Sequence, residues 1–406
     1  MAFTVGINKQ VFYKQETTWG TLAGTGSGKT LRRVTASFNL AKESYESGEI
    51  RTDYQVADFR HGVRSMEGSL SGELSPGTYA DFMGAAVARD FTAGVTSGAG
   101  QVMTTSGTGP TYTLTRASGS WLTDGFKVGD VIRQTVSAFN AGDVNKNFVV
   151  TDITSATALT FIVLNGSTVT IGASAATCVV TVVGKKTFAP TSGHVDRSYT
   201  IEEFYSDIAQ SEVYTGCKVN TMSLALPATG LVTCDFGFMG KDLNTVGTAQ
   251  YFVAPAAQGT SGVFASVNGV LLVNGVAVAL LTGLNVNVNR NMQGASVVGS
   301  NSLAELFEGR IVVEGDFSAY FENATIRDLF KDEVEASLIV VLSTSNDKAA
   351  DFISVVLPRI KVNTNTRDDG EQGIVAQHSF KALLNGTGGT GVKTEKTTIS
   401  IQDSLA

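Results

Sequence analysis

The sequence predicts a mainly β protein with a minor α content. We expect two tandem β-sandwich or β-barrel domains, each with one short flanking helix, and a small all-β barrel or sandwich domain inserted into the first. Three observations predict this class. They are a long-range internal repeat, a composition rich in Gly and poor in charge, and short segments in which apolar and polar residues alternate.

The repeat is clearest between residues 60–82 and 307–329, which align without a gap at an offset of 247, since 307 − 60 = 247. Both segments read as a strand with alternating faces that runs into a short helix. Identical pairs include Gly62/Gly309, Glu67/Glu314, Gly68/Gly315, Ser71/Ser318 and Asp81/Asp328. Upstream, at a slightly different offset, apolar residues alternate in the same way in both copies, at Val34, Ala36 and Phe38 and at Leu284, Val286 and Val288.

Downstream, the tetrapeptide KVNT occurs at 218–221 and again at 361–364, an offset of 361 − 218 = 143. The offset therefore falls by 247 − 143 = 104 residues between the two ends of the repeat. This fall predicts that the first copy carries an insertion of about that length. We expect the first domain at 1–90 and 188–250, the inserted domain at 92–187, and the second domain, with a C-terminal arm that could reach a neighbour, at 260–406.

Each copy is expected to contain one helix. Thr78 follows a Pro-Gly pair that ends the preceding strand, and it could cap a helix over Tyr79–Arg89. The equivalent helix is predicted over Ile326–Glu333. A helix laid against an antiparallel sandwich is an α+β layer arrangement.

The inserted segment contains several short alternating runs, NFVVTDIT, ALTFIVLN and CVVTVVG, between closely spaced turn signals. This pattern is typical of a small β barrel or sandwich. We expect Trp121 and Phe126 in its core rather than on a sugar-binding platform. The alternative that the insert is a surface-recognition or carbohydrate-binding module stays open.

Composition limits the classes of function. The net charge is −7 with a pI near 5.1, which argues against a protein that grips nucleic acid. Only 17% of residues are charged, against roughly 25% in an average domain, so much surface is expected to be hidden in an assembly. Cys178, Cys217 and Cys234 are scattered and odd in number, as buried thiols would be. No signal peptide or membrane-spanning run is recognised, which predicts synthesis in the cytoplasm without membrane insertion.

Residues 23–30, AGTGSGKT, have the spacing of a phosphate-binding loop with Ala in the first position. That loop binds phosphate because a helix begins directly after it. Here the next residues, LRRVTASFNL, alternate as a strand does, so a flexible connection is the preferred interpretation. A nucleotide hydrolase remains a remote alternative. No pattern of an enzyme, a cofactor site or a metal site is recognised elsewhere, so we expect none of these.

The segment 41–60 is long, charged and aromatic, and its counterpart is 290–308. Loops of this length in compact domains are usually functional. We predict that both contact neighbouring subunits or the next ring of an assembly. The candidate interface residues are Lys42, Glu43, Tyr45, Glu49, Arg51, Asp53, Tyr54, Asp58, Arg60, Arg290, Glu305 and Glu308.

The opening YKQETTWGTLAGTGSGKTLRRVTASFNL, followed by SMEGSLSGELSPGTYADFMGAA, resembles the major tail tube proteins of long-tailed bacteriophages. The likeness consists of an early Y-x-x-E-x-x-W-G segment, at Tyr13, Glu16, Trp19 and Gly20, and a strand reading G-x-L-S-x-E-L before a short helix. It covers both copies but not the insert. It implies a β-sandwich whose strands join around a ring into an inner barrel, through which DNA passes without specific binding.

The resemblance also implies a virion protein that assembles in the host cytoplasm. Its implied partners are further copies of itself, the tape-measure protein, the tail terminator and the distal tail or baseplate proteins. A chain with two tube domains implies a ring of three subunits with pseudo-sixfold symmetry rather than a ring of six. An acidic lumen would let DNA slide rather than stick.

Overall fold

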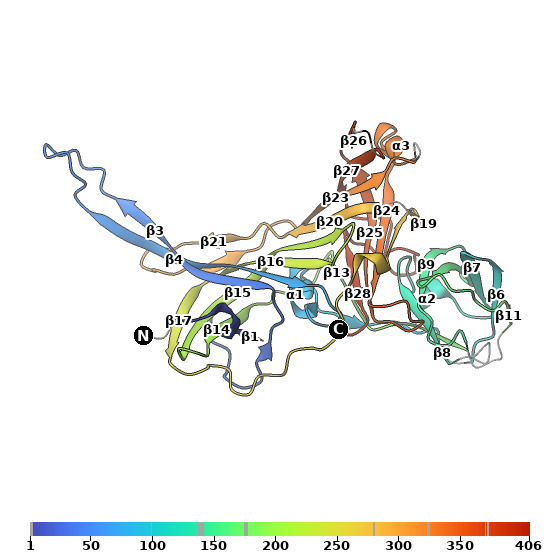
Figure 1. Cartoon of the computed structure of the whole chain (residues 1–406), viewed down its shortest axis with the longest axis horizontal. Coiled ribbons are helices and arrows are strands. Elements are labelled where there is room, and N and C mark those ends of the chain that lie inside the picture. The colour runs from blue at the N-terminus through green and yellow to red at the C-terminus, as the bar shows by residue number, and fades with distance from the viewer. Residues whose placement is uncertain are drawn as a thin grey trace.

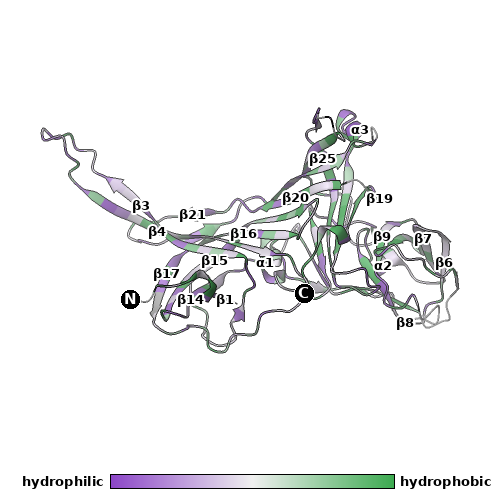
Figure 2. Ribbon diagram, viewed as in Figure 1, coloured by the Kyte–Doolittle hydropathy of each residue, from purple (hydrophilic) through white to green (hydrophobic). Residues whose placement is uncertain are grey.

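The computed structural model describes residues 3–98, 100–136, 142–173, 178–278, 281–322, 325–369, 371 and 373–406. It confirms the mainly β prediction, with 28 strands and three short α-helices among those residues. Figure 1 shows an elongated molecule with a long hairpin at one end and the insert at the other. Figure 2 shows that hydrophobic residues are concentrated in the strands of the body between them.

The first half of the chain and its continuation after the insert form one set of elements. They are β1 (Lys9–Gln15), β2 (Lys29–Thr30), β3 (Thr35–Glu46), β4 (Phe59–Glu73), α1 (Ala80–Ala86), β13 (Lys185–Phe188), β14 (Tyr199–Tyr205), β15 (Gln210–Pro227), β16 (Thr233–Gly240) and β17 (Asp242–Gly247).

The segment predicted to be an insertion, which we call the insert, contributes a separate seven-stranded sheet and one helical turn. Its elements, with the short strand that leads into it, are β5 (Thr92–Ala93), β6 (Met103–Thr108), β7 (Thr111–Arg116), α2 (Trp121–Asp124), β8 (Val131–Val136), β9 (Phe148–Ile153), β10 (Ala158–Val163), β11 (Gly172–Ala173) and β12 (Val179–Val182).

The second half supplies the remaining elements. They are β18 (Gly269–Val273), β19 (Val276–Ala277), β20 (Leu281–Asn289), β21 (Gln293–Ala295), β22 (Glu305–Phe307), β23 (Val312–Tyr320), α3 (Thr325–Lys331), β24 (Ala336–Ser343), β25 (Phe352–Val362), β26 (Thr366–Arg367), β27 (Val375–Ala382) and β28 (Ser400–Asp403).

Eight of these strands form a continuous antiparallel sheet in the order β3–β4–β16–β15–β20–β23–β27–β25. The two halves meet where β15 pairs with β20, from Thr221 opposite Asn289 to Pro227 opposite Gly283. Within each half, four strands follow one another in the same spatial order. We call this eight-stranded sheet the inner sheet.

The long strands β15 and β25 bend out of the inner sheet and pair with a second layer. The first part of β15 pairs with β14 and β17, and the first part of β25 pairs with β24 and β28. In β15 the bend falls at Gly216, whose φ is +69°. A Cβ there would lie 2.9 Å from the Cβ of Lys241, so both the backbone conformation and the space favour Gly.

The strand registers of the two halves correspond residue by residue. Phe38 lies opposite Gly68, and Val286 lies opposite Gly315. The glycines are 247 residues apart, and their partners are 286 − 38 = 248 apart. The alignment of Val34 with Leu284 is therefore wrong by two residues. Leu284 lies opposite Phe317, which corresponds to Leu70, and the residue opposite Leu70 is Ala36.

One face of the inner sheet packs on the second layer and on α1 to make the main hydrophobic core. At its centre the Phe82 ring lies 4.7 Å from Tyr13, 5.2 Å from Tyr199 and 5.3 Å from Phe238, measured between ring centroids. The helix is shorter than the predicted Tyr79–Arg89. Its N-terminus is not capped by the side chain of Thr78, whose hydroxyl instead bonds that of Ser75 at 2.7 Å.

The insert has its own core, in which Trp121 and Phe126 are fully buried and their ring centroids lie 5.0 Å apart, as predicted. It does not stand free of the rest of the chain. Val131 and Val149 pack against Ile339 and Phe352 of the second half in a third hydrophobic cluster. The insert therefore covers the outer face of β18, β24 and β25.

The predicted C-terminal arm does not extend from the body. Strand β28 lies between β13 and β25, with Ile401 opposite both Thr187 and Val355. Nearly every residue of TTISIQD is buried, so this segment is covered on both of its faces, which the sequence pattern did not reveal. The buried Gln402 side chain also bonds the backbone of Val131, so this strand ties the insert to the second half.

Asp403, which ends β28, is buried, and its carboxylate accepts hydrogen bonds from the backbone N–H groups of Gly77 and Leu405 at 2.8 Å each. Burial raises the pKa of Asp403 to about 6 from an ordinary value of 3.8. Because the pKa of Asp403 is higher in the folded state, the contribution of this residue to the free energy of unfolding is complete below pH 3.8 and is lost as pH rises through 6.

The Asp403→Asn substitution removes this pH dependence of stability. We expect the difference in free energy of unfolding between wild type and variant to fall by about 3 kcal/mol between pH 3.5 and 7. Urea unfolding across that range measures it, and a constant difference would contradict the assignment.

Candidate assembly interfaces

The long hairpin β3–β4 carries nine of the predicted interface residues, and all of them are exposed. The predicted loop 41–60 is wrong in its extent, because β3 continues to Glu46 and β4 begins at Phe59. Its pairs include Lys42 opposite Arg64 and Tyr45 opposite Arg60. The strand signal was weak because both faces of the hairpin meet solvent, so apolar residues do not alternate there. The nine residues are Lys42, Glu43, Tyr45, Glu49, Arg51, Asp53, Tyr54, Asp58 and Arg60.

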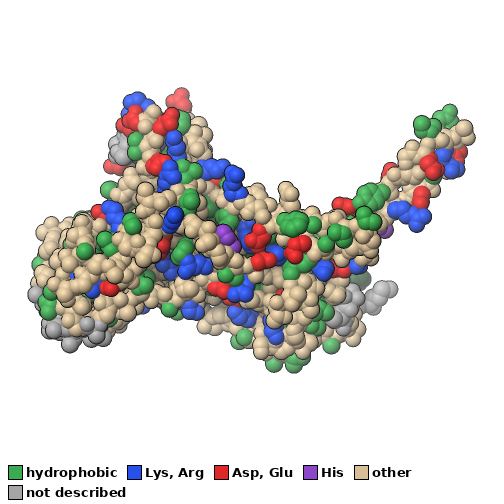
Figure 3. Space-filling model, turned by 180° about the vertical axis from the view of Figure 1, so that it is seen from behind, with side chains coloured by type: hydrophobic (Ala, Val, Ile, Leu, Met, Phe, Trp, Pro, Cys, Tyr) green, Lys and Arg blue, Asp and Glu red, His purple; other side chains and the backbone are tan. Residues whose placement is uncertain are grey.

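Charged residues of the hairpin pair with their own neighbours. Arg51 bonds Asp53 at 2.7 Å, and Arg60 bonds Asp58 at 2.7 Å. The bond from Arg51 lowers the pKa of Asp53. Figure 3 shows the hairpin projecting from the body, with hydrophobic side chains gathered at its tip and charged ones along its stem. Near the tip, Ile50, Tyr54 and Val56 are 103%, 98% and 66% exposed, which is unusual for apolar residues unless another surface covers them.

The counterpart segment 290–308 lies against the first half of the same chain. The N–H of Arg64 in β4 donates to the carbonyl of Asn301 at 2.9 Å. The N–H of Met292 donates to the side-chain oxygen of Asn220 in β15 at 2.9 Å, and that of Arg290 donates to the Asn220 carbonyl at 2.9 Å. Figure 1 shows β21 running alongside the hairpin's base. We call this contact the intrachain junction.

The three remaining predicted residues, Arg290, Glu305 and Glu308, belong to the intrachain junction. Arg290 is only 1% exposed; it bonds Glu308 and donates to the carbonyl of Ala85 at 3.1 Å. It therefore cannot form an exposed contact in the folded chain, because its charge is already neutralised inside it. Burial raises the pKa of Glu308, while Arg290 acts in the opposite direction.

Lys218 is the second buried cation of the intrachain junction. Its ammonium lies 2.5 Å from Asp196 and 3.5 Å from Glu305, and it donates to the carbonyl of Leu306 at 3.4 Å. The sequence analysis used Lys218 only as part of the repeated tetrapeptide. Its place in the repeated tetrapeptide was the signal that could have marked Lys218 as a contact residue.

The face of the inner sheet away from the core is polar. It presents Ser37, Asn39, Ser69, Ser71, Thr221, Ser223, Asn285, Asn287, Ser318, Gln377 and Ser379. Its acidic side chains on β4, β16 and β23 are Glu67, Glu73, Asp235, Glu314 and Asp316. On β27 it carries Lys381, opposite Glu314. Carboxylates outnumber ammonium groups in this part of the sheet.

The inner sheet has two open ends. Among the described residues, β4 is the only strand paired with β3, and β26, which continues the line of β25, pairs only with β27. Two side chains close part of the β3 edge. Lys9 donates to the carbonyl of Ala36 at 2.8 Å, and the Tyr214 hydroxyl donates to that of Phe38 at 2.7 Å. Unpaired strand edges are sites where another chain can add.

The phosphate-loop spacing at 23–30 does not build an anion site. The stretch belongs to the connection between β1 and β2, and Lys29 at its end bonds Asp81 at 2.5 Å. No helix follows; the chain continues into β3. Lys14 donates to the carbonyl of Gly24 at 3.0 Å and also bonds that of Gly26. Backbone carbonyls facing an ammonium group are the reverse of the N–H cradle that phosphate needs.

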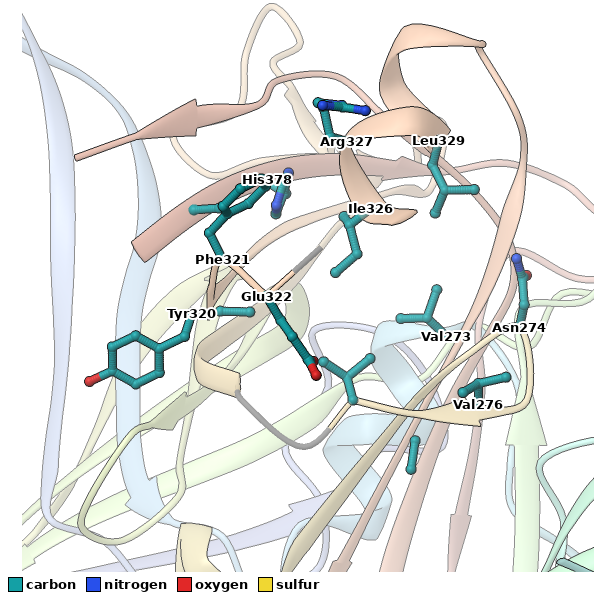
Figure 4. A pocket seen from close by; sticks show the side chains of 14 residues that line it. Val273, Asn274, Val276, Tyr320, Phe321, Glu322, Ile326, Arg327, Leu329 and His378 are labelled. Carbon is teal, nitrogen blue, oxygen red and sulfur yellow. The ribbon is translucent and has the colours of Figure 1, made fainter. Parts of the chain in front are cut away.

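A pocket of about 450 Å³ lies between α3, β18 and the ends of β23 and β27. Figure 4 shows Val273, Ile326 and Leu329 around it. The first half packs aromatic rings at the same position, because Phe82 corresponds to Leu329 (329 − 247 = 82) and Tyr13 in β1 corresponds to Val273 in β18. Smaller side chains in the second half therefore explain the pocket as a packing difference.

Among the described residues, no helix is long and apolar enough to cross a membrane. Within the same residues, no group of three or more His, Cys, Asp or Glu side chains is placed to hold a metal ion.

Comparison with known proteins agrees with the geometry. A search of the curated proteins found no match. A scan against models of protein families matches the phage tail tube protein family over residues 6–382, which is 382 − 6 + 1 = 377 of the 406 residues. The Tyr13–Gly20 segment and all eight strands of the inner sheet fall inside this range. The chain therefore belongs to the phage tail tube protein family.

Proposed function

We propose that three copies of this structural tail tube protein close into a ring, and that the rings stack into the tube of a long, noncontractile phage tail. DNA passes through the lumen during ejection. The observation that carries the proposal is the edge-to-edge pairing of β15 with β20, which joins two sheets of the same strand order within one chain.

A head-to-tail contact that repeats with closing rotation makes a ring. Each chain supplies eight strands to the inner sheet, so three chains give a barrel of 3 × 8 = 24 strands and six similar modules. In this proposal residues 1–90 with 188–250 and residues 260–406 are the two modules of a duplicated tube domain. The matched registers of β3–β4 and β20–β23 support that duplication.

The polar face of the inner sheet is the proposed wall of the lumen. Its opposite face is buried in the hydrophobic core, so in a closed barrel the polar face turns inward and the second layer outward. Glu67, Asp235, Glu314 and Asp316 repel phosphate, and these carboxylates outnumber the ammonium groups of Lys361 and Lys381 on the same face. DNA then slides along the wall without being held.

The insert lies on the outside of the proposed ring. It covers the outer face of β24 and β25, which belong to the layer away from the polar face. Because Trp121 and Phe126 are buried, these aromatic residues offer no platform for sugar rings. The exposed apolar tip of the β3–β4 hairpin is proposed to contact the next ring. Tape-measure, terminator and distal tail or baseplate proteins are the further partners within the tail.

Negative-stain electron microscopy across a concentration series, with mass photometry at each concentration, tests this function. The expected result is rings or tubes with a central hole, built from units of three chains. Rings of six chains would keep the tube function but remove the trimeric arrangement. A monomer that persists at the highest concentration, even after short tube seeds are added, would contradict self-assembly.

A further inference from the structure

The repeated tetrapeptide KVNT forms the intrachain junction at its first occurrence. Lys218 contacts Asp196, Glu305 and the carbonyl of Leu306, as described above. Asn220 receives two N–H groups from the segment that follows β20, and Thr221 begins the pairing of β15 with β20. At residues 218–221, the tetrapeptide therefore contacts both β20 of the neighbouring module and the segment that follows β20.

At the second occurrence, residues 361–364, no such strand is paired among the residues that the structure describes. Asn363 and Thr364 are exposed, and Lys361 bonds Glu333 on the surface at 2.9 Å. The backbone beyond it keeps the same register with its inner neighbour. Thr366 lies opposite Gln377 as Ser223 lies opposite Asp235. The second half thus presents the same edge that the first half uses to bind β20, but with the partner position open.

We propose that the segment 361–369 is the docking edge for β3 of a second copy of this chain, in a fixed register. This inference rests on the ring proposed above and names the strands that close it. Residues of the docking edge lie 143 positions after their counterparts in β15, and residues of β3 lie 248 positions before their counterparts in β20. The observed pair Ser223–Asn287 therefore predicts that Thr366 lies opposite Asn39 of the second copy. Phe38 is then opposite Arg367, and Ala41 opposite Thr364.

The side chains at the predicted contact have the same chemistry as those of the intrachain junction. Ser223 donates its hydroxyl to the side-chain oxygen of Asn287 at 2.7 Å. Thr366 offers the same hydroxyl, and Asn39 is again an Asn. Both side chains are exposed in the isolated chain and lie on the polar face. The proposed contact therefore repeats a hydrogen bond that the chain already makes once.

Charges across the proposed contact are complementary. Glu305, which faces Lys218, corresponds to Asp58 of the hairpin, since 305 − 247 = 58. Asp58 of a second copy is therefore placed to face Lys361. Arg367 takes the position of Leu224 and lies opposite Phe38 of the second copy. The hydroxyl of Tyr214 bonds the carbonyl of Phe38, and it also bonds Glu212 at 3.1 Å. A carboxylate thus stands beside the place that the Arg367 guanidinium would enter.

Cysteine cross-linking tests the register in the full chain. Asn39→Cys with Thr366→Cys places two thiols on directly paired residues, where the Cα separation of about 4.5–5.5 Å suits a disulfide. Under mild oxidation we expect covalent trimers on a non-reducing gel. The native cysteines are buried and give little background. Ser223→Cys with Asn287→Cys is the matched control, because it should close within one chain.

Asn39→Cys with Asp368→Cys is two residues out of register and should cross-link at least tenfold less. A second measurement compares Lys361→Glu with Lys361→Glu/Asp58→Lys. The single reversal is expected to raise the concentration needed for assembly by on the order of tenfold, and the double reversal to restore it. Glu333→Ala, which removes only the intrachain partner of Lys361, should not weaken assembly.

The outcomes separate this inference from the function proposed above. Three-chain rings that fail to cross-link at 39/366 while 223/287 oxidises, or that cross-link better at 39/368, overturn the register and leave the trimeric tube intact. Chains that never assemble overturn both.

Discussion

Glu16→Ala is expected to lower the free energy of unfolding by about 3–5 kcal/mol. The Glu16 carboxylate is buried and accepts four hydrogen bonds, and its removal leaves all four donors without a partner. One oxygen accepts from the N–H of Gly20 at 2.9 Å and the hydroxyl of Ser198 at 2.7 Å. The other accepts from the hydroxyl of Thr200 at 3.0 Å and the N–H of Gly216 at 2.8 Å.

Urea unfolding of the unassembled chain, at one protein concentration, measures this loss. Glu46→Ala is the matched control, because Glu46 is exposed on the hairpin and its loss should change stability by less than about 0.5 kcal/mol. Glu16→Gln keeps one acceptor oxygen but turns an amide toward two donors, so its loss should be intermediate. Equal stability of the Glu16→Ala and Glu46→Ala variants would show that the four bonds contribute nothing net.

Phe82→Ala is expected to cost about 3–5 kcal/mol, the usual range for truncating a buried aromatic ring. Phe82 is fully buried among Tyr13, Tyr199, Phe236 and Phe238, and its removal leaves a cavity that these rigid rings cannot easily fill.

Leu329→Ala provides a control at the equivalent position of the second half. Leu329 is only partly buried and lines the open pocket of Figure 4, so its truncation should cost less than about 1.5 kcal/mol. The same unfolding experiment compares the two variants. If Leu329→Ala were as damaging as Phe82→Ala, the pocket would have to close around that side chain in solution.

The sequence motif that suggested the family proves to be structural. In Y-x-x-E-x-x-W-G, the Tyr13 hydroxyl donates to Asp81 in the first turn of α1 at 3.0 Å, and Glu16 makes the four bonds described above. Trp19 donates its indole N–H to the carbonyl of Gly216 at 3.0 Å, where β15 bends. These residue types could be read from the sequence as a pattern. Their common role is to hold β1 and the turn after it against α1, β14 and β15. Predicting it needed the positions of Ser198 and Gly216, which lie about 180–200 residues away in the chain.

Alternation along single strands was sufficient to predict the β class and the separate core around Trp121 and Phe126. It could not predict where the two halves touch. Arg290 reads as an exposed loop residue because its sequence neighbours are polar, yet it is buried, bonded to Glu308 of its own half and to the carbonyl of Ala85 in the first half. The hairpin β3–β4 was predicted as a loop because strands that are exposed on both faces show no alternation of apolar and polar residues. Contacts between distant segments decide both cases.

Strand β28 sets an order of events during synthesis. The ribosome completes the insert, and both strands that flank β28, well before it makes residues 400–403. The pairing of Lys185 with Asp403 closes a separation of 403 − 185 = 218 residues, so it forms late and slowly. Until then Gln402 cannot bond Val131, and the insert contacts the second half through the cluster around Phe352 and through bonds that include those of Arg133 and Asn147 to residues 349–350. A nascent chain therefore lacks the β28 attachment between the insert and the second half until residues 400–403 have been made.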